Sequence, residues 1–223
     1  MAKTRVTKDA RTTPAIRVSF PQQLFTPKSI KGGEPKYGVA LMFDKSDTAH
    51  MDFMKGIHAD MQAALAEYWP DESARPRNAL IGETLSPIKD GDVTVNKKGI
   101  PLKEKNPEYA GHYIIRVNSS DRPVVVDKNR QEIIDSKVVY GGCFCKVNIN
   151  AYTYDGELSQ GVTIGLNGVQ KWADGESFGA GRPAIDSMFE AAPGGSDDEA
   201  NYNQADPFAK QEDSSGATSD PFG

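Results

Sequence analysis

The chain has 223 residues and a net charge of −5, and 38% of its residues are hydrophobic, below the usual share of a globular protein. No apolar run approaches the ~20 residues of a membrane-spanning helix, and the basic N-terminus lacks the apolar stretch of a secretory signal. We therefore expect a cytoplasmic protein without membrane contact, part of which lies outside any packed core.

The N-terminal part of the chain is predicted to contain two strands and a helix. β-Branched and aromatic runs predict strands at 15–20 and 36–43, separated by a Gly- and Pro-rich loop that carries lysines. Over 47–69 apolar residues recur at intervals of three and four, which is one face of a helix. Ser, Asp and Thr at 46–48 supply N-terminal caps, and Pro70 ends this helix, the only strong one in the sequence.

The following part of the chain is predicted to be mainly strand. After a loop-like stretch over 71–106, strands are predicted at 112–120, 122–127, 131–135, 137–156 and 160–172, with a hairpin turn at 127–130. Several short strands, many turns and one intervening helix indicate a mainly β protein, an OB-like β-barrel with one main α-helix.

Two cysteines, Cys143 and Cys145, lie two residues apart. On a strand they would point the same way, so a disulfide between them would be strained. A zinc site needs about four ligands, and no histidine stands at ligand spacing to the pair. We expect two buried, reduced thiols and no metal or cofactor.

The longest predicted strand carries the main functional signal. One of its faces is small and apolar, and the other presents Phe144, Lys146, Asn148, Asn150, Tyr152 and Tyr154. Rings interleaved with cations and amides on an open sheet are typical of single-stranded nucleic-acid binding, because bases stack on the rings and cations contact the phosphates. The strand at 112–118, which we expect to be its neighbour, places Tyr113, Ile115 and Val117 on one face and His112, Arg116 and Asn118 on the other. The alternative is cross-strand aromatic pairing on a solvated sheet, with Lys146 as a solubilising charge.

These patterns define the candidate binding residues. We predict base stacking on Phe144, Tyr152, Tyr154, Tyr113 and Trp172, and phosphate contacts from Lys146, Arg116, Lys36, Lys31, Lys128 and Arg130. The sequence has no Walker-type phosphate loop and no nucleophile near a histidine in a familiar spacing, so we expect no catalytic residues. A metal-dependent nuclease is a distant alternative.

Three blocks of the sequence resemble a known family. They are GEPKYGVALMFDKSD (33–47), VVYGGCFCKVNINAY (138–152) and GVTIGLNGVQKWADGESFGAG (161–181), which are similar to blocks of phage-encoded proteins of the DUF2815 type. The resemblance spans roughly 13–189. It implies an OB-fold single-stranded DNA-binding protein that coats exposed strands with little sequence preference during phage DNA replication or recombination.

The last segment, 191–223, has seven acidic residues against one Lys and few large apolar groups, so we predict a disordered tail after an ordered domain over 1–190. It carries two Asp-Pro-Phe sequences, Asp206, Pro207 and Phe208, and Asp220, Pro221 and Phe222. They resemble the tail ends of bacterial single-stranded DNA-binding proteins, where Phe enters a pocket on replication and repair partners. The resemblance implies recruitment of replication or recombination proteins, although here Gly223 follows the last Phe. The alternative is a solubilising tail.

Two further functions remain open from the sequence. One is a strand-annealing recombination factor, and the other is a virion or scaffold interaction protein without a nucleic-acid role. The sequence leaves the oligomeric state unknown.

Overall fold

The computed structural model describes residues 4–29, 33–76, 86–96, 98–156 and 159–178. Lys31, the predicted domain boundary at 190 and both Asp-Pro-Phe sequences of the tail lie outside the described residues. Those predictions therefore stay predictions.

Five strands close a β-barrel: β2 (Ile16–Ser19), β3 (Tyr37–Asp44), β5 (His112–Ser119), β7 (Phe144–Asp155) and β8 (Gln160–Ala173). The antiparallel pairs are β2 with β3 and β7, β3 with β5, and β7 with β8. A parallel bridge between Asn118 of β5 and Gly165 of β8 completes the ring. This is a five-stranded barrel of the OB type, and the predicted OB-like fold is confirmed.

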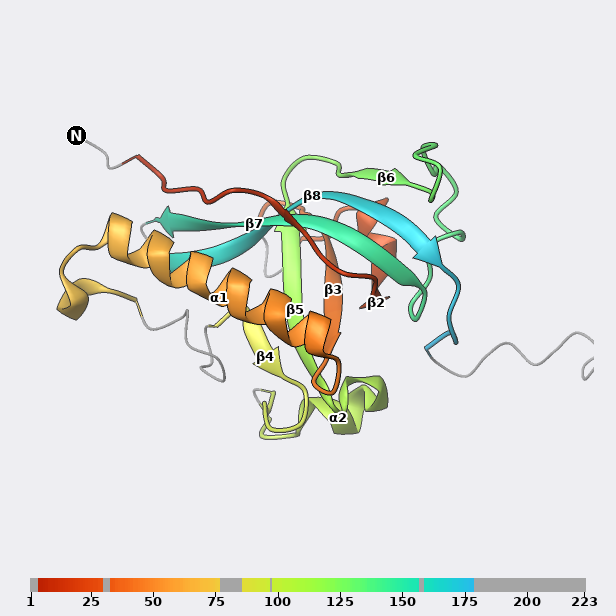
Figure 1. Cartoon of the computed structure of the whole chain (residues 1–223), viewed down its shortest axis with the longest axis horizontal. Helices are drawn as coiled ribbons and strands as arrows, with labels where there is room; N and C mark the ends of the chain where they lie inside the picture. The colour runs from red at the N-terminus through yellow and green to blue at the C-terminus, as the bar shows by residue number, and fades with distance from the viewer. Residues whose placement is uncertain (1–3, 30–32, 77–85, 97, 157–158, 179–223) are drawn as a thin grey trace, which may run out of the picture. The chain divides into compact units, whose positions relative to one another are not determined.

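Three short strands extend the sheet beyond the barrel (Figure 1). β1 (Arg11–Thr12) pairs with the edge of β7, β4 (Ile88–Asp90) pairs with β5, and β6 (Val124–Val126) runs parallel to β8. The segment before β1 continues along β7, where Thr7 bridges to Tyr152. The N-terminal segment thus follows the outer edge of β7.

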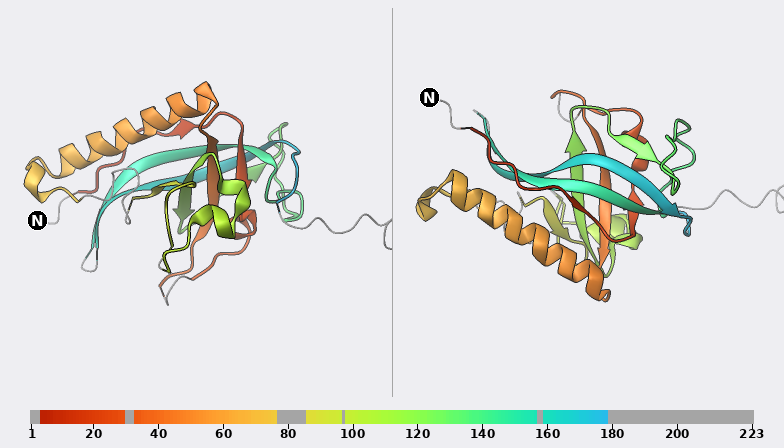
Figure 2. Two further views of the ribbon diagram at one scale, coloured as in Figure 1. Left: turned by 90° about the horizontal axis from the view of Figure 1, so that it is seen from below. Right: turned by 45° about the horizontal axis from the view of Figure 1, so that its top comes forward.

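The predicted helix is α1 (Thr48–Tyr68). Its N-terminus is capped by the Asp47 carboxylate, which accepts hydrogen bonds from the backbone N–H groups of Ala49 and His50. Its apolar face, which includes Met54, Ile57, Met61 and Leu65, is buried in the core shared with the barrel. Figures 1 and 2 show α1 running along one side of the β7–β8 hairpin.

Side chains alternate across the barrel wall as predicted. Ile115 and Val117 of β5, and Cys145, Val147 and Ile149 of β7, are fully buried in the core. The residues between them, such as Arg116 and Lys146, therefore point outward. Both cysteines are buried free thiols with 3.7 Å between their Sγ atoms, so that prediction is confirmed.

Two strand predictions were wrong. Residues 131–135 form no strand, and only Glu132 bridges to Val126. β7 begins at Phe144 rather than 137, because turns occupy 137–142. The predicted turn at 127–130 does form, since the Asp127 carboxylate accepts hydrogen bonds from the N–H groups of Asn129 and Gln131.

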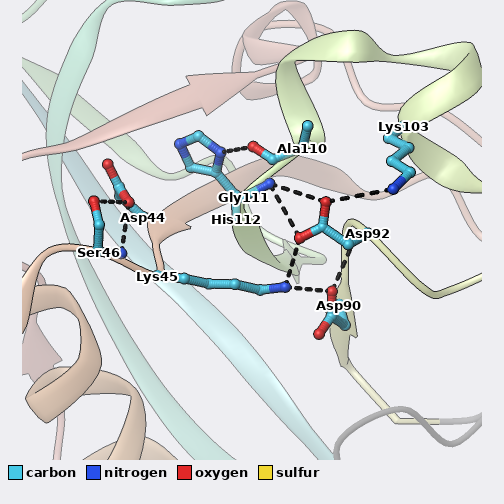
Figure 3. Close-up of polar contacts among 9 residues, drawn as sticks. All are labelled: Asp44, Lys45, Ser46, Asp90, Asp92, Lys103, Ala110, Gly111 and His112. Atoms are coloured by element: carbon cyan, nitrogen blue, oxygen red, sulfur yellow. Dashed lines mark hydrogen bonds and ion pairs between the residues drawn. The ribbon is translucent and has the colours of Figure 1, made fainter.

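Ion pairs fasten the segment 86–111 to the end of β3 (Figure 3). The Lys45 ammonium lies 2.6 Å from the Asp90 carboxylate and 2.7 Å from that of Asp92. Asp92 also accepts a hydrogen bond from the Gly111 N–H group at 3.2 Å and lies 3.8 Å from Lys103. This cluster positions α2 (Leu102–Lys105) and the 3₁₀ turn η4 (Pro107–Tyr109) beside the barrel.

Candidate nucleic-acid interface

The outer face of β3 and β5 is divided into a covered and an open half. In the covered half Ala40, Met42 and Ile114 pack with Tyr109, and Leu102 and Phe178 are packed against them. Burial raises the pKa of the Tyr109 hydroxyl.

The open half lies toward the β2–β3 loop and carries Arg116 and Asn118. Arg116 is exposed, and Asn118 pairs with Gly38 of β3. The absence of a side chain at Gly38 makes room for Asn118, because a Cβ there would lie 2.5 Å from its Oδ1 atom. An exposed cation and an amide therefore stand side by side on β5.

Three adjoining hollows run past this open half. The first, of about 520 Å³, lies between the β2–β3 loop and the β7–β8 turn and is lined by Lys28, Lys36, Asn118 and Ser159, among others. A second hollow shares Lys28 and Gln23 with it. A third, of about 670 Å³, shares Phe20 and Gln22 with the second and reaches Arg17, Lys105 and Phe178. We call the three together the groove.

Cations without an ion pair lie in the groove and beside it. Among the residues that the structure describes, Lys28 and Lys36 of the groove and Arg116 of the adjoining open half form no ion pair. The lining also includes the acidic residues Glu34, Glu108 and Glu176. Arg17 is engaged differently, because its guanidinium carbon lies 4.2 Å from the centroid of the Phe178 ring. Three free positive charges beside an open sheet face suit a row of phosphates.

Phe20 is the more exposed of the two aromatic residues in the described lining of the groove, the other being Phe178. Phe20 follows β2 directly, is 43% exposed and has a left-handed backbone with φ of 56°. Such a backbone is rare for an aromatic residue, and strain of this kind gathers at binding sites. Phe20 was not among the predicted site residues. The available signal was an aromatic residue placed directly before Pro21 at the end of a strand.

The outer face of the β7–β8 hairpin carries most of the predicted stacking residues. Phe144, Lys146, Asn148, Tyr152 and Tyr154 occupy alternate positions of β7 and are all partly accessible. The helix α1 lies on the other side, where Ala151, Thr153 and Ile164 are buried. The predicted ring-bearing face is thus free of the helix.

Two β-bulges in β8 project side chains onto this face. Cys145 pairs with Lys171 and Phe144 with Ala173, so Trp172 is the extra residue of one bulge. At the other bulge Asn167 is the extra residue. The side-chain N–H of Asn167 donates a hydrogen bond to the side-chain oxygen of Asn148 at 2.9 Å. We call the outward side chains of Lys146, Asn148, Tyr152, Asn167, Gln170 and Trp172 the hairpin strip.

Cations lie against both rings of the hairpin strip. The Lys146 ammonium is 3.5 Å from the centroid of the Trp172 ring. The Arg5 guanidinium carbon is 3.4 Å from the centroid of the Tyr152 ring. Phe144 is less accessible, because the backbone at Gly175 passes close to its ring.

The turn that carries Lys128 and Arg130 lies beside the hairpin strip. The Gln170 side chain donates to the carbonyl oxygens of Asp127 and Lys128, both at 3.3 Å. In the described part of the chain neither Lys128 nor Arg130 forms an ion pair.

Tyr113 lies on the same side of β5 as Ile115 and Val117, as the alternation predicted, and its ring packs against the core rather than standing on the outer face with Arg116. The structure corrects the expected arrangement of the strands, because β5 and β7 are not neighbours and β8 lies between them on the side of the Asn118 bridge. The predicted residues therefore divide between two surfaces: Lys36 in the groove with Arg116 beside it, and Lys146, Tyr152 and Trp172 on the hairpin strip.

In the part of the chain that the structure describes, no three His, Cys, Asp or Glu side chains gather as metal ligands. None of the helices in that part of the chain is long and apolar enough to cross a membrane.

Comparison with known proteins points to phage proteins. Residues 10–201 match the family described as "Enterobacter phage Enc34, ssDNA-binding protein". A relative, "Putative protein p50" of Acyrthosiphon pisum secondary endosymbiont phage 1, is 27% identical over 180 residues, which cover 78% of this chain and 89% of the relative. The phage character expected from the sequence blocks is confirmed, and the DUF2815 designation stays a prediction.

Solved structures agree with this match. The single-stranded DNA-binding protein of bacteriophage Enc34 in complex with ssDNA superimposes with a TM-score of 0.62 and 25% identity, over 76% of this chain and 89% of that one. The single-stranded DNA-binding protein gp2.5 of bacteriophage T7 shares the fold, with a TM-score of 0.51 and 16% identity over 83% of this chain and 96% of that one.

Proposed function

The chain belongs to the family of the single-stranded DNA-binding protein of Enterobacter phage Enc34, and we propose on this premise that it coats single-stranded DNA through the groove. The protein is not an enzyme, in agreement with the character of this family. The observation that carries the proposal is the place of the groove. It runs past the open half of the outer face of β3 and β5, and its first hollow lies between the β2–β3 loop and the β7–β8 turn, where OB folds bind oligonucleotides.

The side chains in and beside the groove contact two different parts of the DNA, the phosphates and the bases. Lys28, Lys36 and Arg116 neutralise phosphates, which requires no particular sequence. The exposed ring of Phe20 receives a base by stacking, worth about 1–3 kcal/mol and tolerant of every base. Cations and a ring in one groove thus account for binding with little sequence preference.

In this proposal the protein acts in the host cytoplasm on DNA exposed during phage replication or recombination. Coating removes hairpins and blocks nucleases. The acidic tail, through Phe208 and Phe222, recruits replication or recombination proteins, since each Phe supplies apolar area and the neighbouring acids steer the encounter with a basic partner. A strand-annealing activity is tested separately, by mixing complementary oligonucleotides with the protein.

The test of the groove is a fluorescence titration of the full chain with labelled oligo-dT and with duplex DNA at several salt concentrations. We expect tighter binding to the single strand than to the duplex. For each contacted phosphate, the binding constant should fall by about 0.7 logarithmic units per tenfold rise in salt concentration. The double variant Arg116→Gln with Lys36→Gln is expected to bind about tenfold more weakly and to lower the salt slope by about 1.4.

A matched control is Lys55→Gln, which removes an exposed charge from α1, where Lys55 pairs with Asp52. It is expected to bind like the parent chain. Equal affinity and salt slope for the groove variant and the Lys55→Gln control would exclude the groove as the phosphate path.

A further inference from the structure

We propose that the hairpin strip is a second binding surface for the same DNA strand, which continues from the groove across the outer face of the β7–β8 hairpin. The proposal rests on the proposed function, because it extends the path of a strand already held in the groove. It assigns a role to Trp172, Lys146 and Tyr152, which lie outside the groove.

The two surfaces meet at the bridge that closes the barrel. Asn118 lines the groove and pairs with Gly165 of β8. The ring of Tyr152 lies over Gly165, because a Cβ at that position would be 3.0 Å from the ring. A strand that leaves the groove at Asn118 therefore reaches the ring of Tyr152 next.

From Tyr152 the strip follows β7 to Trp172, which is level with Cys145. Seven residues of a strand span about 23 Å. The stretch between the two rings is lined by the side chains of Asn148, Asn167 and Gln170. These amides donate to Thr12, to Asn148 and to the carbonyl oxygens of Asp127 and Lys128, respectively. Their remaining donor and acceptor sites can meet the edges of unpaired bases.

Trp172 has the exposure that a stacking residue needs. It is 45% exposed, whereas Trp69, the other tryptophan of the chain, is 8% exposed and packs on Tyr68. A β-bulge projects the indole outward, and bulges commonly re-aim a side chain beside a binding site.

The cations of the strip lie where phosphates would follow stacked bases. Lys146 and Arg5 lie against the rings of Trp172 and Tyr152, and Gln170 donates a hydrogen bond to the backbone carbonyl of Lys128 in the adjoining turn. In the complex a base takes the ring face, and the cation, already within 4 Å of the ring, moves to the adjoining phosphate.

The nearest acidic groups are engaged elsewhere. The Asp174 carboxylate pairs with the Lys171 ammonium at 2.7 Å, which lowers the pKa of Asp174. The Asp127 carboxylate accepts backbone hydrogen bonds within its own turn. Among the described residues Lys146 of the strip, and Lys128 and Arg130 of the adjoining turn, form no ion pair.

Tryptophan emission reports directly on the proposed contact. In the Trp69→Phe variant Trp172 is the sole indole, and we expect oligo-dT of about 16 nucleotides to quench its emission strongly. In the Trp172→Phe variant the buried Trp69 is the sole indole, and its emission is expected to stay constant. Should Trp69→Phe not fold, 5-fluorotryptophan in the unaltered chain gives two ¹⁹F signals, of which only that of Trp172 should shift.

Affinity for two strand lengths separates the strip from the groove. The variant Trp172→Ala with Lys146→Gln is expected to lose about tenfold in affinity for oligo-dT of about 16 nucleotides and nothing for one of about 5. The groove variant Arg116→Gln with Lys36→Gln is expected to lose affinity for both lengths.

Unchanged Trp172 emission, together with unchanged affinity of the strip variant for the long strand, would overturn this inference and leave the groove intact. If the groove variant instead kept its affinity for both strand lengths, the proposed function of the groove would be overturned. The two failures are therefore distinguishable.

Discussion

The guanidinium carbon of Arg116 lies 5.8 Å from the centroid of the Phe20 ring, across the outer face of the barrel. This distance is within the range of a cation–π interaction. It links an exposed cation on β5 to an exposed ring that the chain holds in a left-handed backbone conformation. The exposed ring of the groove and a cation beside the groove thus interact before any ligand arrives.

We predict that replacing Phe20 separates binding from stability. Phe20→Ala and Phe20→Gly both remove the ring, so both should weaken binding to oligo-dT by about 5- to 50-fold. Only glycine adopts the left-handed backbone without steric cost, so Phe20→Gly should be more stable than Phe20→Ala by about 1 kcal/mol.

Fluorescence titration and denaturant unfolding of the two variants measure these quantities. Equal stability of the alanine and glycine variants would show that position 20 carries no backbone strain. Parent-like affinity in both would remove Phe20 from the strand path.

We predict that Lys45→Met lowers the melting temperature by about 2–4 °C at neutral pH. The change leaves the carboxylates of Asp90 and Asp92 facing each other without their shared cation. DNA affinity should be unchanged, because this cluster lies outside the groove and the hairpin strip. A thermal scan followed by an oligo-dT titration provides the measurement.

The same cluster should make stability depend on pH at both extremes. The hydrogen bond from Lys45, aided by that from Gly111, lowers the pKa of Asp92, so its contribution is present above about pH 4 and is lost as the pH falls through the lowered value. Burial opposes the charge of Lys45, but hydrogen bonds to Asp90 and Asp92 outweigh it and raise its pKa.

The contribution of Lys45 is therefore present below about pH 10.4 and is lost as the pH rises through the raised value. Thermal scans of the parent chain and of Lys45→Met across this range measure both losses. Both dependences should flatten in Lys45→Met, and identical profiles would rule out the ion pairs as their source.

We predict that Cys143 and Cys145 resist alkylation in the folded protein. The hydrogen bond from the Cys145 thiol lowers the pKa of Cys143 to about 7, which by itself would make this thiol reactive. Both side chains are fully buried, however, so a reagent has no access until the barrel opens. Iodoacetamide labelling followed by mass spectrometry, with and without denaturant, should show modification only in denaturant.

We predict that a chain ending at Ala192 binds oligo-dT more tightly than the full chain, most clearly at low salt. The removed segment carries seven acidic residues against one Lys, and we expect it to compete with phosphates for the cations of the groove. A full-length variant with Phe208→Ala and Phe222→Ala keeps this charge and should bind DNA like the parent. Equal affinity of the truncated and full chains would exclude competition by the tail.

Much of the local structure could be predicted because its causes are local. The spacing of Met54, Ile57 and Met61 and the Asp47 cap place α1 at 48–68, close to the predicted 47–69. Alternation in 112–119 and 144–155 correctly separated Arg116 and Lys146 from the buried residues beside them. Residues 131–135 were wrongly predicted to form a strand because they include two β-branched residues. In the structure this segment follows a turn and forms only one bridge, between Glu132 and Val126.

The amino-acid sequence by itself determined that a mainly β chain would carry rings, amides and cations on one face of its longest strand. Only the tertiary structure decided that Arg116 and Lys146 lie on different surfaces and that Phe20 borders a groove. The physical reason is that side chains alternate between the two faces of a strand because of the local backbone geometry. Which side chains share a surface depends instead on which strands pair, and these can be far apart in the chain. Here one bridge, from Asn118 to Gly165, closes the barrel between residues far apart in the chain.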